Sequence, residues 1–117
     1  MNLVIKMKEN EEKIISSMPD DYTIQTVAEA MKQLGDASRL RIFWLLCHFE
    51  ECVSGIAELT GMTSPAVSHH LRLLKSSGLI VSKRSGKEMY YKAADNELVD
   101  FLHHAIEKVA NITCPEK

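Results

Sequence analysis

Four residues near the C-terminal end of the 117-residue chain have the types and spacing of a metal site. Asp100, His103, His104 and Glu107 stand at positions i, i+3, i+4 and i+7, so a helix would carry them on one face. Imidazole nitrogens combined with carboxylate oxygens suit zinc, nickel or cobalt. The same spacing is also typical of the solvated face of an amphipathic helix. Both interpretations stay open at this point.

The three cysteines of the chain, at positions 47, 52 and 114, offer a second kind of chemistry. If Cys47, Cys52 or Cys114 come together in the fold, their thiols can bind a thiophilic ion such as Cd(II) or As(III), or form a disulfide. The odd number argues against a disulfide-stapled scaffold and favours the reducing cytoplasm. Cys47 is equally consistent with a small core residue and Cys114 with a residue of the tail.

A formal net charge of −2 conceals a basic segment. Between Met62 and Lys92 the net charge is +5, because Glu88 is the only acidic residue there, and the rest of the chain carries −7. A localised excess of positive charge suits contacts with the phosphates of a nucleic acid. An ordinary solvated surface can show the same charge pattern, so the position of these residues in the fold matters.

Hydrophobic periodicity predicts the elements that must position these side chains. Gly35, Gly61 and Gly78 mark the ends of helices, and Thr63 or Ser64 is expected to cap a helix that has proline at its first position. A turn containing glycine separates two short extended pieces, which is the pattern of a β-hairpin. The expected helices span 22–34, 36–48, 53–59, 65–76 and 95–112, the last one capped by Asp95, and the expected strands span 79–84 and 88–92.

The order of a short helix, a turn and a polar-faced helix is that of a helix-turn-helix, whose second helix enters the major groove of DNA. A basic hairpin follows directly and suits contacts with the phosphate backbone or the minor groove. Each feature alone is common on protein surfaces, but their adjacency within the basic segment favours nucleic-acid binding. The candidate DNA contacts are Ser64, Ser68, His69, His70, Arg72 and Lys75 in the helix, and Arg84 and Lys87 in the hairpin.

Four stretches of the sequence stand out together: LGDASRLRI at 34–42, Cys52-Val53, TSPAVSHHLRLLKSSGLI at 63–80, and R-x-G-K-x-x-Y-Y at 84–91. In combination they resemble the ArsR/SmtB family of small bacterial winged-helix repressors, which sense metals or thiol chemistry. The resemblance covers residues 22–112. It implies a homodimer joined through its first and last helices, a palindromic operator, and release of the DNA when an effector binds.

The resemblance also implies where a metal would bind, and the sequence departs from both family patterns. The family's Cys-Val-Cys is present here as Cys52-Val53-Ser54, with one thiol instead of two. Its Asp-x-His at the start of the last helix is present as Asp95-Asn96-Glu97, and the later ligand positions fall on Lys108 and Asn111. The histidine and carboxylate face at 100–107 and the cysteines are therefore the remaining candidates for an effector site.

These observations predict a mainly α-helical fold with a small β-hairpin, a winged helix-turn-helix. Residues 1–19 are expected to form an N-terminal extension, 20–114 the DNA-binding domain and 115–117 a short tail. We expect a cytoplasmic homodimeric repressor that binds a double-stranded, palindromic DNA operator. Its release from the operator is expected to follow the binding of a metal ion (Zn, Ni, Cd or As(III)) or of a thiol-reactive effector.

Other functions are compatible with parts of the pattern. A winged-helix regulator without a metal site could respond to oxidation, to sulfur species or to a partner. An adaptor that binds proteins instead of DNA is disfavoured by the basic segment. An enzyme is disfavoured because the sequence lacks a glycine-rich phosphate loop, an H-E-x-x-H motif and a nucleophile elbow. A membrane partner is not expected, since no apolar run approaches the about 18–20 residues of a membrane-spanning helix.

Overall fold

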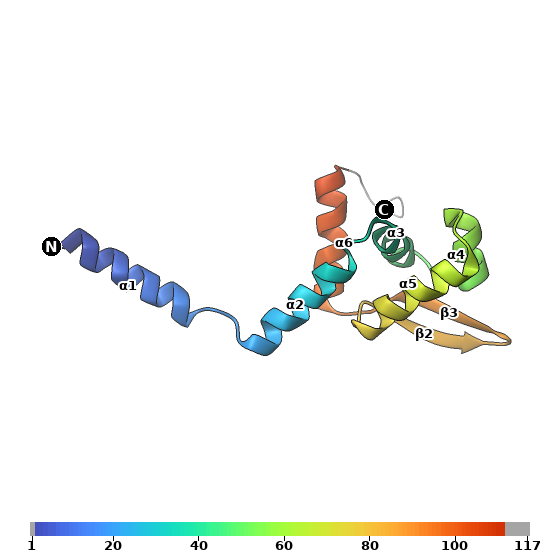
Figure 1. Cartoon of the computed structure of the whole chain (residues 1–117), viewed down its shortest axis with the longest axis horizontal. Helices are drawn as coiled ribbons and strands as arrows, with labels where there is room; N and C mark the ends of the chain where they lie inside the picture. Colours follow the sequence, from blue (N-terminus) through green and yellow to red (C-terminus); the bar gives the residue numbers. More distant parts are fainter. Residues whose placement is uncertain (1, 112–117) are drawn as a thin grey trace.

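The computed structural model describes residues 2–111, with side chains from residue 8 onward. Six helices and three short strands make up this part of the chain (Figure 1). In chain order they are α1 (Asn2–Ser16), α2 (Asp21–Gln33), α3 (Ala37–Leu46), β1 (Glu51–Cys52), α4 (Val53–Thr60), α5 (Ser64–Ser76), β2 (Ile80–Ser85), β3 (Glu88–Ala93) and α6 (Glu97–Ala110). The predicted fold class, mainly helical with a small hairpin, is confirmed.

Polar side chains begin four of the helices by accepting hydrogen bonds from backbone N–H groups that have no partner within the helix. Asp20 caps α2, Asp36 caps α3 and Thr63 caps α5 in this way. The prediction that Asp95 caps the last helix is wrong. The side chain of Asn96 accepts the hydrogen bond from the backbone of Val99, so α6 begins one residue later.

Helices α4 and α5 form the helix-turn-helix, and the turn between them depends on a glycine. Gly61 ends α4 with a φ of 76°, a left-handed conformation that a residue with a Cβ adopts only with strain. Pro65 then lies in the first turn of α5, where its missing N–H breaks no helical hydrogen bond. This geometry turns the chain sharply and directs α5 across the front of the domain (Figure 1).

The hairpin of β2 and β3 is the wing of the fold. Its strands pair antiparallel from Ile80 opposite Ala93 to Ser85 opposite Glu88, so the loop has only two residues, Gly86 and Lys87. Strand β1 adds to the other edge of β3, and the sheet order is β1-β3-β2. The sequence did not predict β1, because two residues show no alternation of polar and apolar side chains and the strand exists only through its pairing with β3.

One hydrophobic core joins the helix-turn-helix to the wing and to α6. All helices from α2 to α6 contribute, together with the start of β2, and α2 contributes Ala30. Helix α3 is the centre of the core, as its dense apolar sequence predicted. The largest fully buried side chains are Ile42, Phe43, Leu46, Ile56, Val67, Leu71, Leu74, Leu79 and Ile80. Packing of α4, α5 and α6 around the same core fixes their relative positions.

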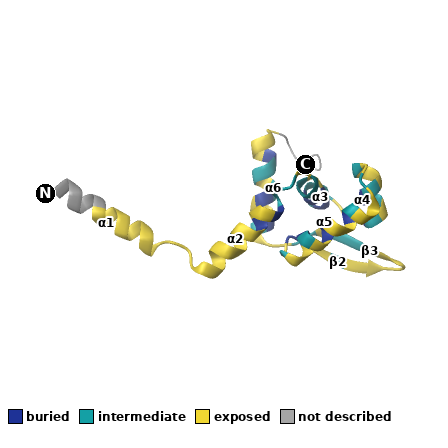
Figure 2. Cartoon of the chain, in the orientation of Figure 1, coloured by how far each residue is buried: buried dark blue, intermediate teal, exposed yellow. Residues whose placement is uncertain are grey.

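Helix α1 extends away from this body, and α2 joins it through its C-terminal end, where Ala30 and Gln33 are buried (Figure 1). The molecule measures 70 × 29 × 22 Å along its principal axes. Almost all of the described side chains of α1 and α2 are exposed (Figure 2). Several exposed residues are large and apolar, including Ile24 and Met31 on α2 and Phe101 and Val109 on α6. Within residues 2–111, no helix is long and apolar enough to span a membrane. Cys114 and the tail at 115–117 lie outside the described residues.

Candidate functional site

The first candidate site is the outer face of α5 together with the wing tip, which we call the α5–wing surface. One face of α5 buries Val67, Leu71 and Leu74 in the core. The helical period therefore turns the intervening polar positions to solvent. Of the eight predicted DNA contacts, seven are exposed: Ser64, Ser68, His69, Arg72, Lys75, Arg84 and Lys87.

Positive charge on this surface comes from two elements that the fold places next to one another. Arg72 and Lys75 lie on α5, and Arg72 Nη1 is 3.3 Å from the ring nitrogen Nδ1 of His69. Arg84 lies at the end of β2, and Lys87 lies in the two-residue loop after Gly86. Flexible, exposed cations on a helix and on an adjacent hairpin can contact phosphates on both sides of a groove.

His70, the eighth predicted DNA contact, has a different environment. Its side chain is 15% exposed, and its Nδ1 accepts a hydrogen bond from Arg39 Nη1 at 3.3 Å. Asp36 Oδ2 lies 4.0 Å from the same nitrogen. Burial, opposed by the charge of Asp36 and aided by that of Arg39, lowers the pKa of His70. The neutral ring thus connects α5 to the start of α3.

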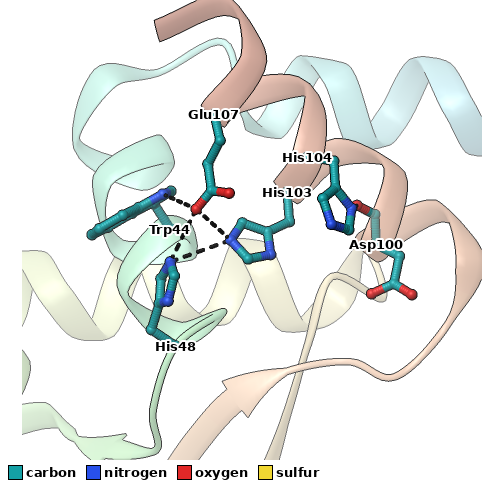
Figure 3. A network of polar contacts seen from close by, with 6 residues as sticks. All are labelled: Trp44, His48, Asp100, His103, His104 and Glu107. Carbon is teal, nitrogen blue, oxygen red and sulfur yellow. Dashed lines mark hydrogen bonds and ion pairs between the residues drawn. The ribbon is translucent and has the colours of Figure 1, made fainter. Parts of the chain in front are cut away.

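The second candidate site is a largely buried group of His48, His103 and Glu107, which we call the α3–α6 cluster (Figure 3). His48 follows the end of α3, and the other two residues lie one turn apart on α6. His103 Nε2 is 3.2 Å from His48 Nε2 and 2.9 Å from Glu107 Oε2, and His48 Nε2 is 3.3 Å from the same oxygen. Three potential metal-ligating atoms therefore converge at one point.

Trp44 completes the surroundings of the cluster. Its indole Nε1 donates a hydrogen bond to Glu107 Oε2 at 3.3 Å, and its ring lies 4.4 Å from that of His48 between centroids. Burial of Glu107 raises the pKa of its carboxyl group. The hydrogen bond and charge of His103, together with hydrogen bonds from Trp44 and His48, outweigh burial, so the net effect is a lowered pKa. The carboxylate is thus ionised and shared by three donors.

The structure divides the metal site predicted from the sequence. His103 and Glu107 belong to the α3–α6 cluster, whereas Asp100 and His104 are exposed and lie outside it (Figure 3). The ring of His104 donates from Nδ1 to the carbonyl oxygen of Asp100 at 2.8 Å. Sequence analysis missed His48, which lies 55 positions before His103 and falls after the end of α3. No local pattern marks that residue as a partner of α6.

The two described cysteines have separate environments. Cys47 packs partly buried against the core. Cys52 is buried, and its Sγ lies 3.3 Å from Ser54 Oγ at the start of α4. The two are not joined by a disulfide. The thiol interpretation of Cys47, Cys52 and Cys114 stays a prediction, with Cys114 outside the described residues.

A pocket of about 320 Å³ opens beside the α3–α6 cluster. His48 and His103 line it, together with Asp100 and residues from the loop after α3 and the end of β3. The cluster is thus largely buried but lies beside an open pocket, which gives a small ion a path to it.

Comparison with known proteins identifies the family of the helix-turn-helix. The profile of the family described as bacterial regulatory protein, arsR family, matches residues 36–82, which include α3, α4 and α5. A cadmium resistance transcriptional regulatory protein CadC homolog from Staphylococcus aureus is 37% identical over 92 residues, covering 74% of each chain. A transcriptional repressor SmtB homolog from Synechocystis is 40% identical over 76 residues, covering 65% of this chain and 58% of that relative's length.

A solved structure supports the same relationship at the level of the fold. The homodimeric winged helix-turn-helix DNA-binding domain of Mb0332 from Mycobacterium bovis, a possible ArsR-family transcriptional regulator, superposes with a TM-score of 0.70. It is 35% identical and covers 81% of this chain and 90% of that domain. Similarity in sequence and fold thus covers most of the chain, whereas the family profile itself ends at residue 82, before the wing tip and α6.

Proposed function

Because the chain belongs to the arsR family of bacterial regulatory proteins, we propose that it is a homodimeric repressor that binds operator DNA and is released by an effector. Its relatives are named as transcriptional regulators and not as enzymes. The observation that carries the proposal is the α5–wing surface, on which seven polar or basic residues of α5 and the adjacent hairpin are exposed.

The residues of this surface divide between two tasks. Ser64, Ser68 and His69, in the N-terminal half of α5, have short polar groups that can read base edges in the major groove. Lys75 and the wing residues Arg84 and Lys87 are suited to phosphates, and Arg72 is suited to either guanine or phosphate. His70 supports them by holding α5 against α3, since its ring is engaged by Arg39 and Asp36.

Dimerisation through the N-terminal helices and α6 is supported by apolar side chains that a single protomer leaves exposed. Met31 on α2 is 56% exposed, and Phe101 and Val109 on α6 are 66% and 88% exposed. Large apolar groups of this kind favour a subunit interface. A two-fold dimer places two copies of α5 on one side, so the operator is expected to be palindromic. The protein acts in the cytoplasm, where the operator is.

The experiment is fluorescence anisotropy of the reduced protein on the DNA upstream of its own gene, against a scrambled fragment of equal length. Specific binding that weakens steeply with salt supports the proposal. Replacing Arg72 and Lys75 by alanine should weaken binding, whereas replacing the exposed Arg41 on α3 should not. Equal affinity for both fragments at moderate salt would contradict sequence-specific repression.

The effector is tested on the same complex. Zn(II), Ni(II), Cd(II) and arsenite are added in turn, followed by an oxidant. Release by one metal, reversed by a chelator, makes the protein a metal-responsive repressor. Release by oxidant alone, reversed by a dithiol, assigns the response to the cysteines instead.

A further inference from the structure

We propose that the α3–α6 cluster binds one divalent transition-metal ion, of the zinc, nickel and cobalt class, inside each protomer. The ligands are Nε2 of His48, Nε2 of His103 and a carboxylate oxygen of Glu107. This site differs from the two positions implied by family resemblance, which are the cysteine at the start of α4 and the Asp95 to Asn111 pattern on α6. It also differs from the helix face at 100–107, because one ligand comes from the end of α3.

The spacing of the three atoms fits a metal ion. Zinc lies about 2.0–2.1 Å from nitrogen and oxygen ligands in a tetrahedral site, which puts the ligands about 3.3 Å from one another. The three separations in the cluster are 3.2, 2.9 and 3.3 Å. The edges of one face of a coordination tetrahedron are therefore already formed, and only small side-chain adjustments are needed to admit the ion.

The donor set selects the class of metal. Two imidazoles and one carboxylate suit zinc, nickel and cobalt, whereas calcium and magnesium favour oxygen ligands alone and arsenite and cadmium favour thiolates. Side-chain exposures of 4% for His48, 15% for His103 and 9% for Glu107 mean that few waters compete for these atoms. Metal binding needs both Nε2 atoms unprotonated. A neutral ring that carries its proton on Nε2 therefore changes to the tautomer with the proton on Nδ1, whereas an imidazolium ring releases its Nε2 proton to solvent.

Two further features support a bound ion. Trp44 donates to the oxygen of Glu107 that faces both histidines, which orients this carboxylate as an outer-shell partner does at metal sites. The pocket of about 320 Å³ reaches His48 and His103 and supplies an entry path. A water molecule from this pocket can take the remaining coordination position.

The site joins two parts of the molecule with different tasks. Helix α3 packs directly on α5, which carries the DNA-reading residues. Helix α6 carries exposed apolar residues assigned above to the dimer interface. An ion that ties the end of α3 to α6 thus fixes the recognition helix relative to the dimer axis, and this can change its fit to the two half-sites. This regulatory consequence rests on the proposed function, whereas the metal site does not.

The test uses Trp44, the only tryptophan of the chain, as a reporter within the cluster. Co(II) and Ni(II) are titrated into the metal-free full-length protein, and indole fluorescence and the visible absorption of Co(II) are followed. We expect quenching that saturates at one ion per protomer. The Co(II) spectrum should show low-symmetry d–d bands without an intense thiolate charge-transfer band. Such a charge-transfer band would assign the metal to the cysteines and overturn the proposal.

Variants identify the ligands. His48→Gln and His103→Gln should each weaken binding by more than the ~10–100-fold that loss of an outer-shell partner costs. His104→Gln is the matched control, because it removes an adjacent histidine on α6 that lies outside the cluster. Unchanged affinity in His48→Gln, or equal losses in His104→Gln, would overturn the site. Should a variant fail to fold, ring nitrogen NMR of the wild-type protein decides, since zinc should shift the Nε2 signals of two of its five histidines.

DNA anisotropy on the same samples separates this inference from the proposed function. Metal binding at the cluster without specific DNA binding refutes the repressor and leaves the metal site intact. The opposite result is specific DNA binding with no change in Trp44 fluorescence or in the histidine NMR signals when zinc, nickel or cobalt is added. This result refutes the metal site and leaves the repressor intact. Metal-dependent release that is lost in His48→Gln supports both.

Discussion

The α5–wing surface and the α3–α6 cluster both consist mainly of polar and charged side chains, but in opposite environments. On the surface, Arg72, Lys75, Arg84 and Lys87 are exposed and can move to meet a partner. In the cluster, one carboxylate oxygen of Glu107 is approached by Trp44, His48 and His103 within 3.3 Å. A surface of flexible charges suits a large polyanion, whereas converging buried groups suit a single small ion.

The two regions also depend on the fold to different degrees. The α5–wing surface needs one helix and one hairpin, each of which presents its own side chains. The cluster exists only when the end of α3 and the middle of α6 are packed together, since its ligands come from both. A substitution in the core should therefore disturb both regions, whereas a substitution on the surface should affect one region and leave the other unchanged.

The largest effect is expected from Phe43→Ala, because Phe43 is fully buried at the centre of the core. Loss of a buried phenylalanine costs about 3–5 kcal/mol of unfolding free energy, a large part of the about 5–15 kcal/mol typical of a folded domain. Both DNA binding and the Trp44 response to metal should fail. Urea unfolding measures the loss. Phe49→Ala is the control, since the Phe49 ring is 41% exposed and its removal should lower the free energy of unfolding far less. Equal decreases in the two variants would show that α3 is not the centre of the stabilising core.

Charge removal at the wing tip should affect one region alone. In a dimer, Arg84→Ala combined with Lys87→Ala removes four cations, so the slope of log affinity against log salt should fall by about four. Operator affinity should weaken on the order of 100-fold at moderate salt. Metal titration followed by Trp44 fluorescence should not change. An unaltered salt slope would mean that the wing does not reach the phosphates.

The two regions also differ in how far the sequence predicts them, because one presents side chains from single elements and the other needs two elements packed together. For the α5–wing surface the sequence predicted the exposure of seven of the eight residues, because the period of Val67, Leu71 and Leu74 fixes which side chains of α5 point outward, and Gly86 marks the hairpin tip. Their contact with DNA stays a prediction. His70 departs from the pattern, since its tertiary contacts with Asp36 and Arg39 draw it inward. Its role was not predictable from α5 alone.

For the cluster, the sequence supplied only the part that lies on one helix. His103 and Glu107 were identified as one face of α6, but so were Asp100 and His104, because spacing does not show which members of a face meet another element. His48 and Trp44 reach the cluster through the packing of α3 against α6. Strand β1 was missed for the same physical reason: its pairing partner, β3, lies about forty residues away.

A smaller change, Trp44→Phe, tests the cluster without removing a ligand. The hydrogen bond to Glu107 Oε2 is lost, and the aromatic ring that packs beside His48 is kept. Affinity for Ni(II) or Co(II) should fall by ~10-fold, the lower end of the effect of outer-shell partners. Isothermal titration calorimetry measures it, since this variant has no indole reporter. DNA affinity without metal should not change, and a loss there would place Trp44 in the support of α5 instead.

The smallest effect concerns His70, which lies on α5 but has an environment closer to that of the cluster. Its pKa is lowered by burial, with Arg39 and His69 acting in the same direction and Asp36 opposing them. The unfolded chain therefore binds a proton more readily at this position than the folded chain does. The contribution of neutral His70 to stability is present above pH ~6.5, the ordinary pKa of histidine, and is lost as the pH falls below it.

Urea unfolding in the presence of a chelator, at pH 7.5, 6.5 and 5.5, measures this contribution. His70→Gln should be less stable than the wild type at pH 7.5, and the difference should shrink toward pH 5.5, whereas His104→Gln should follow the wild-type pH dependence. His70→Gln should also weaken the binding of all DNA sequences to a similar degree, because it loosens the attachment of α5 to α3. A change in base preference with no change in stability would instead show that His70 reads DNA. In that case a residue's position on α5, and not the burial of its side chain, would decide whether it belongs to the α5–wing surface.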